Sequence, residues 1–206
     1  MKVLMINGSP HKSGTTNRAL KEIGVALEEN GVNYEIITVG DKDIVGCKAC
    51  AACSKLGKCI NDKDIVNEII EKVKQADGLI VGSPVYYSGM NGTLKSLLDR
   101  VFFGKSCFAN KPATAIAVAR RAGTTATVDA INKYFAINNM PIVSSQYWNM
   151  AFGSNGEQVE KDEEGMQTMR MIGVNMAWIL KCIEAGKEKG IMPPEHEKHV
   201  KTNYIR

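Results

Sequence analysis

Residues 78–100 read GLIVGSPVYYSGMNGTLKSLLDR, and this stretch decides the fold. It opens with an apolar run, residues 78–84, that has the character of a strand buried on both faces. A loop rich in glycine and tyrosine follows, and then an amphipathic helix is predicted over about 92–103. Strand, loop and helix in this order form the repeating unit of a parallel α/β sheet.

The same unit recurs along the chain. Further strands are predicted at 2–8, 34–39, 114–120 and 141–147. Further helices are predicted over about 15–29, 64–75, 124–138 and 163–187. Five strands alternating with five helices predict an α/β protein with a five-stranded parallel sheet and helices on both faces.

We expect one domain over residues 1–190, followed by a polar C-terminal tail over 191–206. A cysteine-containing loop, residues 46–60, is inserted after the second strand. On the last helix, apolar residues recur at steps of three and four, which predicts a packing stripe rather than a metal site. The stripe consists of Met166, Met169, Ile172, Met176, Leu180 and Ile183.

Composition and charge exclude several classes of protein. Of the 206 residues, 44% are hydrophobic and 23% are charged, which is typical of a globular protein. The N-terminal run MKVLMINGSP is too short to span a membrane and lacks the layout of a signal peptide, so we expect a cytoplasmic protein without membrane contact. The dispersed net charge of +4 argues against nucleic acid as a partner and against the strongly acidic surface of a small electron carrier.

Residues 7–17, NGSPHKSGTTN, connect the first strand to the first helix and predict an anion site. A helix start directs free N–H groups into such a loop, and open parallel sheets bind ligands at the carboxyl ends of their strands. The spacing matches neither the dinucleotide fingerprint nor the P-loop. The alternative is a polar connection with a threonine cap. The candidate phosphate-binding residues are Ser9, His11, Lys12, Ser13, Thr15, Thr16 and Asn17.

The loop after the third strand suits a planar ring. Pro84 stiffens the backbone, Tyr86 and Tyr87 offer aromatic faces, and the backbone N–H groups of residues 86–89 can reach ring oxygens and nitrogens. A tyrosine-containing turn without a ligand is the alternative. A third loop, beginning with Arg120 after the fourth strand, lies at the same edge of the predicted sheet.

Strand–GSP together with strand–GSPVYYxxxNGTLKxxLDR resembles the flavodoxin-like NAD(P)H-dependent FMN reductase superfamily, and the resemblance covers residues 2–187. It implies a three-layer sandwich with strand order 2-1-3-4-5, bound FMN, NAD(P)H as electron donor, and a homodimer or homotetramer. It also implies that the first loop holds the FMN phosphate and that the other two contribute to the ring site. The ring-site residues so implied are Ser83, Pro84, Val85, Tyr86, Tyr87, Ser88, Gly89, Arg120 and Gly123.

Four of the six cysteines lie within residues 46–59, GCKACAACSKLGKC, with the spacing C-x2-C-x2-C-x5-C. A reducing cytoplasm disfavours structural disulfides, and zinc sites prefer two separated cysteine pairs. The motif resembles that of the iron–sulfur flavoproteins, a branch of the same superfamily, which implies a [4Fe–4S] cluster bound by Cys47, Cys50, Cys53 and Cys59. The same loop without iron remains the alternative. The two remaining cysteines, Cys107 and Cys182, are expected to be buried small hydrophobes.

These observations predict an FMN-dependent oxidoreductase. FMN would take a hydride from NAD(P)H and pass electrons to a small-molecule acceptor or redox partner, directly or through the cluster. No side chain is assigned a catalytic role, because the cofactor carries the chemistry. Two other hypotheses stay open, namely a flavodoxin-like or ferredoxin-linked electron-transfer protein and a regulatory sensor that uses the cysteine loop. The tail histidines, His196 and His199, are expected to be solvated.

Overall fold

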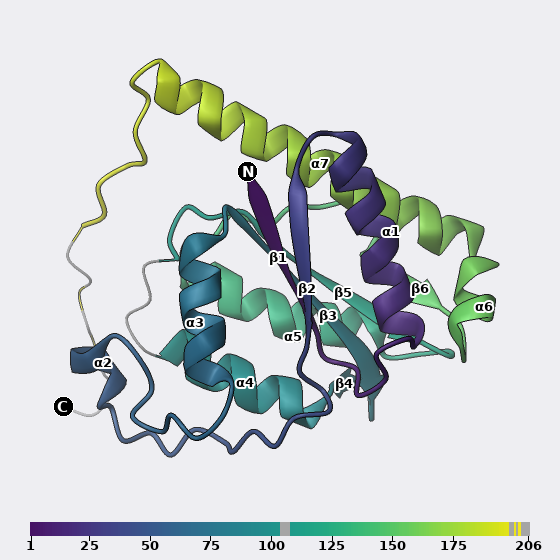
Figure 1. Ribbon diagram of the computed structural model, residues 1–206, viewed down its shortest axis with the longest axis horizontal. Coiled ribbons are helices and arrows are strands. Elements are labelled where there is room, and N and C mark those ends of the chain that lie inside the picture. Colours follow the sequence, from purple (N-terminus) through teal and green to yellow (C-terminus); the bar gives the residue numbers. More distant parts are fainter. Residues whose placement is uncertain (104–107, 198–199, 201, 203–206) are drawn as a thin grey trace.

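The computed structural model describes residues 1–103, 108–197, 200 and 202. Its parallel sheet has the order β2-β1-β3-β5-β6 (Figure 1). The five strands are β1 (Lys2–Asn7), β2 (Asn33–Thr38), β3 (Gly78–Tyr86), β5 (Ala113–Ala119) and β6 (Met150–Phe152). Counted along the chain, these parallel strands follow the predicted order 2-1-3-4-5. A two-residue strand, β4 (Gly89–Met90), pairs antiparallel with the end of β3 and was not predicted.

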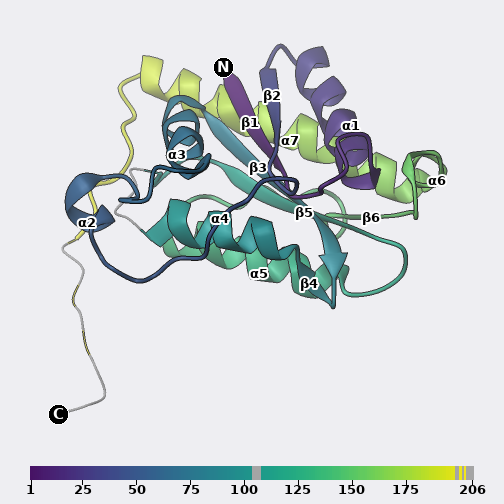
Figure 2. The ribbon, with the colours of Figure 1, turned by 60° about the horizontal axis from the view of Figure 1, so that its bottom comes forward.

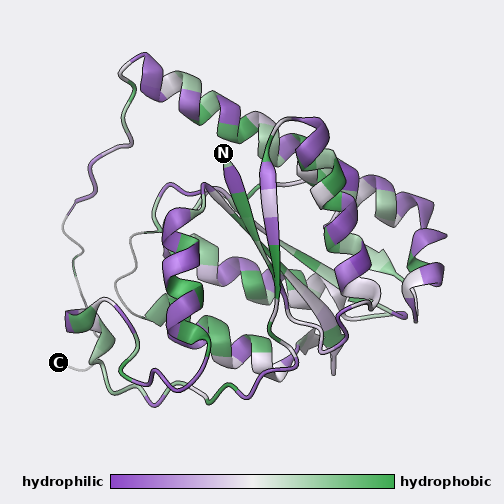
Figure 3. Cartoon of the chain, viewed as in Figure 1, coloured by the Kyte–Doolittle hydropathy of each residue, from purple (hydrophilic) through white to green (hydrophobic). Residues whose placement is uncertain are grey.

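Helices cover both faces of the sheet, which confirms the three-layer architecture (Figure 2). One layer contains α1 (Thr15–Glu29), α6 (Gly156–Glu160) and α7 (Glu163–Glu188). The other contains α3 (Val66–Gln75), α4 (Gly92–Phe103) and α5 (Thr124–Ile137). Figure 3 shows apolar residues on the central strands and on the helix sides that face them, so each layer buries one amphipathic face against the sheet.

The short helix α2 (Cys53–Leu56) belongs to neither layer. It lies in the cysteine loop, at the end of the molecule marked by α2 in Figures 1 and 2. Neither α2 nor α6 was predicted from the sequence, because each is too short to show a helical period. Helix α3 begins two residues later than predicted, since Oδ1 of Asp64 accepts a hydrogen bond from the Val66 N–H at 3.2 Å and so precedes the first turn.

The fifth strand was predicted at 141–147, and this prediction is wrong. Ile142 forms only an isolated bridge with Ala113, and the strand itself is β6. A buried polar network interrupts the pairing, because the Thr114 hydroxyl donates to the Val143 carbonyl at 2.6 Å and accepts from the Asn149 amide at 2.8 Å. The chain between these contacts leaves the sheet and exposes two aromatic residues in edge-to-face contact, Tyr147 and Trp148.

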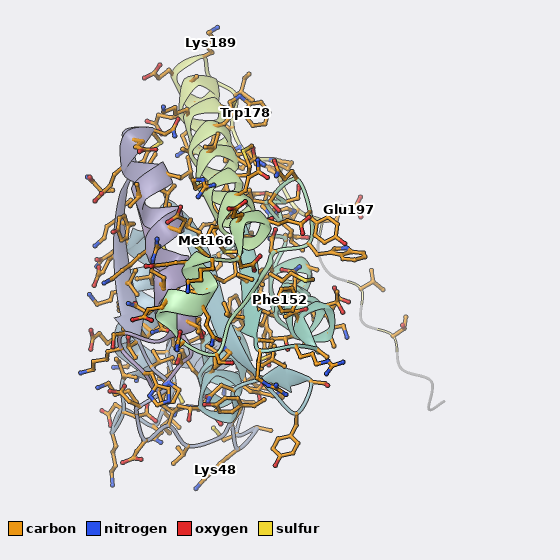
Figure 4. The ribbon with its side chains drawn as sticks, turned by 90° about the vertical axis from the view of Figure 1, so that its right-hand side faces the viewer. Lys48, Phe152, Met166, Trp178, Lys189 and Glu197 are labelled. Carbon is orange, nitrogen blue, oxygen red and sulfur yellow. The ribbon has the colours of Figure 1, made fainter. Side chains whose placement is uncertain are left out.

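The apolar stripe of α7 packs against α1 and the sheet, as predicted, with Met166, Met169 and Met176 buried. The prediction for Cys182 is wrong, because this residue lies on the outer side of the helix and is exposed. Figure 4 shows Trp178 on the side of α7 turned away from α1. None of the helices in the described part of the chain is long and apolar enough to cross a membrane. Cys107 and His199 lie outside the described residues.

Candidate functional site

Three loops that follow neighbouring strands meet at one edge of the sheet. Strands β1, β3 and β5 are adjacent and parallel, so their carboxyl ends lie side by side. The loops that leave them contain the three predicted cofactor-binding segments. The fold therefore brings these segments to the edge where open parallel sheets bind ligands.

The first loop is shaped by Asn7, a buried amide at the end of β1. Its Oδ1 accepts from the Ser9 N–H at 3.0 Å, and its Nδ2 donates to the Thr38 hydroxyl at 3.2 Å. The hydroxyl of Ser9 in turn accepts from the His11 N–H at 3.2 Å. Asn7 was not among the predicted site residues, although an asparagine ending an apolar strand was a visible signal.

The start of α1 has the features of an anion site. Gly14 is its N-cap, no side chain of the described residues caps the helix, and its first turn contains no acidic residue. Thr16 is fully buried, and its hydroxyl has no hydrogen-bond partner among the described residues. A buried hydroxyl normally has a partner, so this group fits a ligand oxygen at the helix N-terminus, where the dipole favours negative charge.

The other predicted residues of the first loop divide by exposure. Asn17 is buried and Thr15 half-buried, whereas His11, Lys12 and Ser13 are exposed. The Lys12 ammonium lies 3.9 Å from a carboxylate oxygen of Asp41 in the following loop, too far for a hydrogen bond. The buried members can thus contact a ligand from the helix side, while the exposed members form the rim.

Gly40, just after β2, fixes the shape of the first loop from outside. A Cβ at this position would lie 2.2 Å from the Gly8 carbonyl oxygen and 2.4 Å from the Ser9 carbonyl carbon. Only glycine allows this approach, so the backbone of the loop is braced by the backbone that leads into the cysteine loop.

The second loop is a tight β-hairpin. Tyr86 pairs with Gly89, and the two residues between them, Tyr87 and Ser88, have φ values of 50° and 58°. Two positive φ values at the tip define a type I′ turn, which normally uses asparagine and glycine. Both tyrosine side chains are exposed, and that of Tyr87 is fully so. The hairpin thus presents aromatic surface from a strained backbone, a feature that clusters at functional sites.

Ser83 supports this hairpin from within. It is buried, and its hydroxyl donates to the Pro84 carbonyl at 2.7 Å and accepts from the Asn91 N–H at 3.0 Å. The side chain of Asn91 then caps α4, accepting from the Leu94 N–H at 3.1 Å. Ser83 was predicted as a cofactor-binding residue, and here its hydroxyl joins the hairpin to the start of α4.

The third loop packs directly onto the second. Gly123 has a φ of 88°, and a Cβ there would lie 2.7 Å from the Cα of Ser88 and 2.9 Å from a methyl carbon of Val85. The side chain of Arg120 is exposed. The structure therefore brings the second and third loops together and leaves this guanidinium on their outer rim.

The cysteine loop forms a separate site. All four of its cysteines line one cavity of about 540 Å³, which Arg100 and Phe103 of α4 also line. Cys47 and Cys50 are exposed, whereas Cys53 and Cys59 are half-buried. None of the five described cysteines forms a disulfide. In both ribbon views α4 lies between this site and the β3–β4 hairpin (Figures 1 and 2).

The buried guanidinium of Arg100 anchors the cysteine loop. It forms an ion pair with Asp64 and donates to the carbonyls of Val45 at 3.2 Å and Asn61 at 2.8 Å. Its Nε lies 3.3 Å from Sγ of Cys59, within hydrogen-bonding distance of sulfur. Burial opposes the charge, but the hydrogen bonds to Asp64 and Cys59 outweigh it, so the pKa of Arg100 is raised. Arg100 was not predicted as a site residue.

Asn67 of α3 holds the backbone of Cys59 from the other side. Its Oδ1 accepts from the Cys59 N–H at 2.8 Å, and its Nδ2 donates to the Cys59 carbonyl at 2.9 Å. Between Cys47 and Cys53, the positive φ values of Ala49 and Ala51, 50° and 56°, turn the chain so that successive cysteines face the cavity.

The thiols are close enough to affect one another. Burial raises the pKa of the Cys53 thiol, and the other three thiols of the loop add to the rise. In the described part of the chain, no three His, Cys, Asp or Glu side chains are arranged to hold a single metal ion. Four thiols around one wide cavity are instead a donor set that fits an iron–sulfur cluster, which needs several thiolates spread over one volume.

Comparison with known proteins agrees with this geometry. Residues 1–155 match the family described as NADPH-dependent FMN reductase. An iron–sulfur flavoprotein of Methanocaldococcus jannaschii is 35% identical over 193 residues, covering 89% of this chain and 100% of that protein. An iron–sulfur flavoprotein of Methanosarcina thermophila is 34% identical over 198 residues, covering 92% and 100%.

The fold has relatives among solved structures. An archaeal flavodoxin shares it with a TM-score of 0.62 at 15% identity, over 88% of this chain and 99% of its own. The flavodoxin-like fold, the family match and the two flavoprotein relatives lead to one conclusion. The chain belongs to the NADPH-dependent FMN reductase family, in its iron–sulfur flavoprotein branch, and is an oxidoreductase that carries FMN.

Proposed function

We propose that this protein takes electrons from NAD(P)H through FMN and passes them on, with a [4Fe–4S] cluster in the cysteine cavity as a second redox centre. The observation that carries the proposal is that four free thiols line one cavity in a protein of the FMN reductase family. A flavin reductase that used FMN alone would have no chemical need for such a cavity.

Each FMN loop has a distinct task in this proposal. The N-terminus of α1, with the buried Thr16 hydroxyl, binds the phosphate. The hairpin backbone at residues 86–89 and the third loop hold the ring. When bound, FMN supplies hydride acceptance at N5 and release of electrons singly or in pairs. The protein binds, orients and shields, and no side chain need act as an acid or base.

Cys47, Cys50, Cys53 and Cys59 are the proposed cluster ligands. They supply the four thiolates that a [4Fe–4S] cluster requires, and the small alanine side chains between them leave room for it. When bound, the cluster supplies one-electron transfer. Arg100 and Asn67 keep Cys59 facing the cavity.

The surface of the hairpin supports direct entry of small molecules. Tyr86, Tyr87 and Arg120 are all exposed, and this exposure supports direct access of a nicotinamide donor and a small-molecule acceptor to the ring in turn. An oligomer is also part of the proposal, because Tyr147 and Trp148 before β6 and Trp178 on α7 are all exposed. The two segments are in contact, since the Asn175 amide of α7 donates to the Ser144 carbonyl at 2.8 Å. A homodimer or homotetramer would cover this aromatic surface.

A second candidate function is electron transfer without NAD(P)H turnover, for example with ferredoxin. The observation that favours it is the exposure of the cysteine loop together with two exposed lysines that line the cavity, Lys48 and Lys63. A positively charged rim suits docking of an acidic redox protein. Figure 4 shows Lys48 at the end of the molecule opposite Lys189, where a partner would meet no obstruction from α7.

The test begins with the protein purified without oxygen, on which FMN, iron and acid-labile sulfide are measured. We expect one FMN and about four irons per chain, the number that a [4Fe–4S] cluster requires. Cys50→Ser should remove most of the iron and leave FMN in place, whereas Cys182→Ser, which changes an exposed cysteine on α7, should leave both. Wild-type protein with FMN and no iron would contradict the cluster.

Steady-state oxidation of NADH and NADPH then separates the two functions. A reductase turns over with a quinone, a nitro compound or oxygen as acceptor, and Cys50→Ser retains this activity. Absence of turnover with every acceptor, alongside rapid reduction of the protein by reduced ferredoxin, would favour the electron-transfer function instead.

A further inference from the structure

Arg100 brings a buried positive charge to the cysteine cavity. Its side chain is only 2% exposed, and its partner Asp64 is 8% exposed. A buried arginine that merely fixed a loop would need only carbonyl and carboxylate acceptors. Here one N–H is directed instead at the sulfur of Cys59, at 3.3 Å.

We propose that Arg100 is a positioning residue that orients Cys59 as a cluster ligand and raises the reduction potential of the cluster. This inference rests on the proposed cluster. The number of hydrogen bonds to the sulfurs and the net charge around a cluster are two of the factors that set its potential. A guanidinium beside one ligand adds both a hydrogen bond to its sulfur and a positive charge. Each raises the reduction potential, because reduction adds negative charge to the cluster.

Cys59 differs from the other three cysteines in its surroundings. Among the described residues, Cys47 receives only a weak contact, from the Ala49 N–H at 3.4 Å. The sulfur of Cys59 faces the guanidinium of Arg100, and Asn67 forms hydrogen bonds with both the N–H and the carbonyl of the Cys59 backbone. The charge of Arg100 therefore acts mainly at one corner of the cavity, through a ligand whose position is fixed.

Asp64 limits the effect of Arg100. Its carboxylate pairs with the guanidinium and cancels part of the positive charge that the cavity experiences. The two residues should therefore shift the potential in opposite directions. Removing the arginine leaves a net negative charge beside the cluster, and removing the carboxylate leaves a net positive one. A merely structural pair would not produce this opposition.

The experiment is a redox titration of the iron-loaded protein, with the reduced cluster followed by EPR and the flavin by absorption. We expect Arg100→Gln to lower the one-electron reduction constant of the cluster at least tenfold, about 59 mV. Arg100→Lys, which keeps the charge but lacks the planar fork, should fall between that variant and the wild type. Asp64→Asn should raise the potential.

Two controls separate tuning from general damage. Arg170→Gln removes an arginine from α7, which packs in the opposite helix layer, and should leave the cluster potential unchanged. The midpoint potential of FMN should also stay the same in all variants. Iron content is measured on every sample, so that loss of the cluster is not mistaken for a shift.

The outcomes distinguish the two proposals. Wild-type protein without iron would overturn the cluster and this inference together. An intact cluster whose potential is the same in wild type, Arg100→Gln and Asp64→Asn would overturn only the role of Arg100. Should Arg100→Gln fail to fold or to hold iron, Asp64→Asn decides the matter, since an unchanged or lowered potential in that variant contradicts the proposal.

Discussion

The three loops proposed to bind FMN, called the FMN loops below, and the cysteine loop are held in place in different ways. The FMN loops extend directly from buried strands and pack backbone against backbone, at Gly40 against Gly8 and at Gly123 against Ser88. The cysteine loop contains little regular structure, and side chains from α3 and α4 hold it, chiefly Asn67 and Arg100. The shape of the first site is thus set by the sheet, whereas the shape of the second depends on a few polar side-chain contacts.

This difference predicts how each site responds to change. A backbone contact can be disturbed only by a residue that adds bulk at the point of contact, so most substitutions in the FMN loops should be local. A loop held by a few polar side chains should loosen as a whole when one of them is removed. The following predictions test this contrast, in order of expected effect.

Gly40→Ala should have the largest effect. The new Cβ would lie 2.2 Å from the Gly8 carbonyl oxygen, and the backbone atoms it meets cannot rotate away. We expect a loss of about 1–3 kcal/mol in the free energy of unfolding, together with at least tenfold weaker FMN binding. Urea denaturation and fluorescence titration of FMN measure the two effects. Gly46→Ala is the matched control, since a Cβ there meets nothing within 4 Å, and equal losses in both variants would refute the backbone contact.

Asn67→Ala should loosen the cysteine loop and spare the FMN site. It removes both hydrogen bonds to the backbone of Cys59, at a cost of about 1–2 kcal/mol. Hydrogen exchange should rise over residues 46–60 and stay unchanged over residues 8–17. Exchange that rises equally in both segments would show that the two sites are not held independently.

Acid should weaken the contact between α1 and α7 before it disturbs the sheet. Burial opposes the charge of Glu22, but hydrogen bonds from Arg170 at 2.6 Å and Arg18 at 2.8 Å dominate and lower its pKa below the ordinary 4.5. The stabilisation is therefore present above pH 4.5 and lost as the pH falls through the lower folded pKa. Because Arg170 is half exposed, we expect at most about 1 kcal/mol.

The measurement for Glu22 is the free energy of unfolding of wild type and Glu22→Gln at a series of pH values from 7 to about 3. The two curves should differ at neutral pH and converge in acid. Curves that stay parallel throughout would mean that this carboxylate adds nothing to the contact between α1 and α7.

The smallest expected effect is a gain in stability at the hairpin tip. Tyr87 has a left-handed backbone, which costs roughly 1–2 kcal/mol for most residues, and its exposed side chain has no packing to lose. Tyr87→Asn should recover part of this cost, about 0.5 kcal/mol, because asparagine tolerates the conformation. Thermal unfolding measures the gain. A loss of stability would indicate that the tyrosine ring contributes contacts of its own.

The sequence allowed the first four parallel strands, and the three loops that meet at one edge of the sheet, to be predicted because their signals are local. Apolar runs marked the strands, two of them running into Gly-Ser-Pro, and the loops follow the strand ends directly. The interruption before β6 was missed, since it depends on Thr114 pairing with Asn149, far away in the chain. Arg100 was missed for the same reason. A single arginine on an amphipathic helix looks solvated until the fold places it against Cys59, 41 residues away in sequence.

Helix α4 sets both the distance of Arg100 from the hairpin and the direction in which this residue points around the helix axis. Its cap, Asn91, belongs to the hairpin, and Arg100 lies on its third turn, roughly 12 Å from the helix start at 1.5 Å per residue. One residue inserted between them would lengthen the helix by only about 1.5 Å but rotate Arg100 by about 100°, away from the cavity. Inserting a full turn would nearly restore the direction and displace the guanidinium by about 5 Å. The cysteine site is therefore tied to the number of residues in this helix.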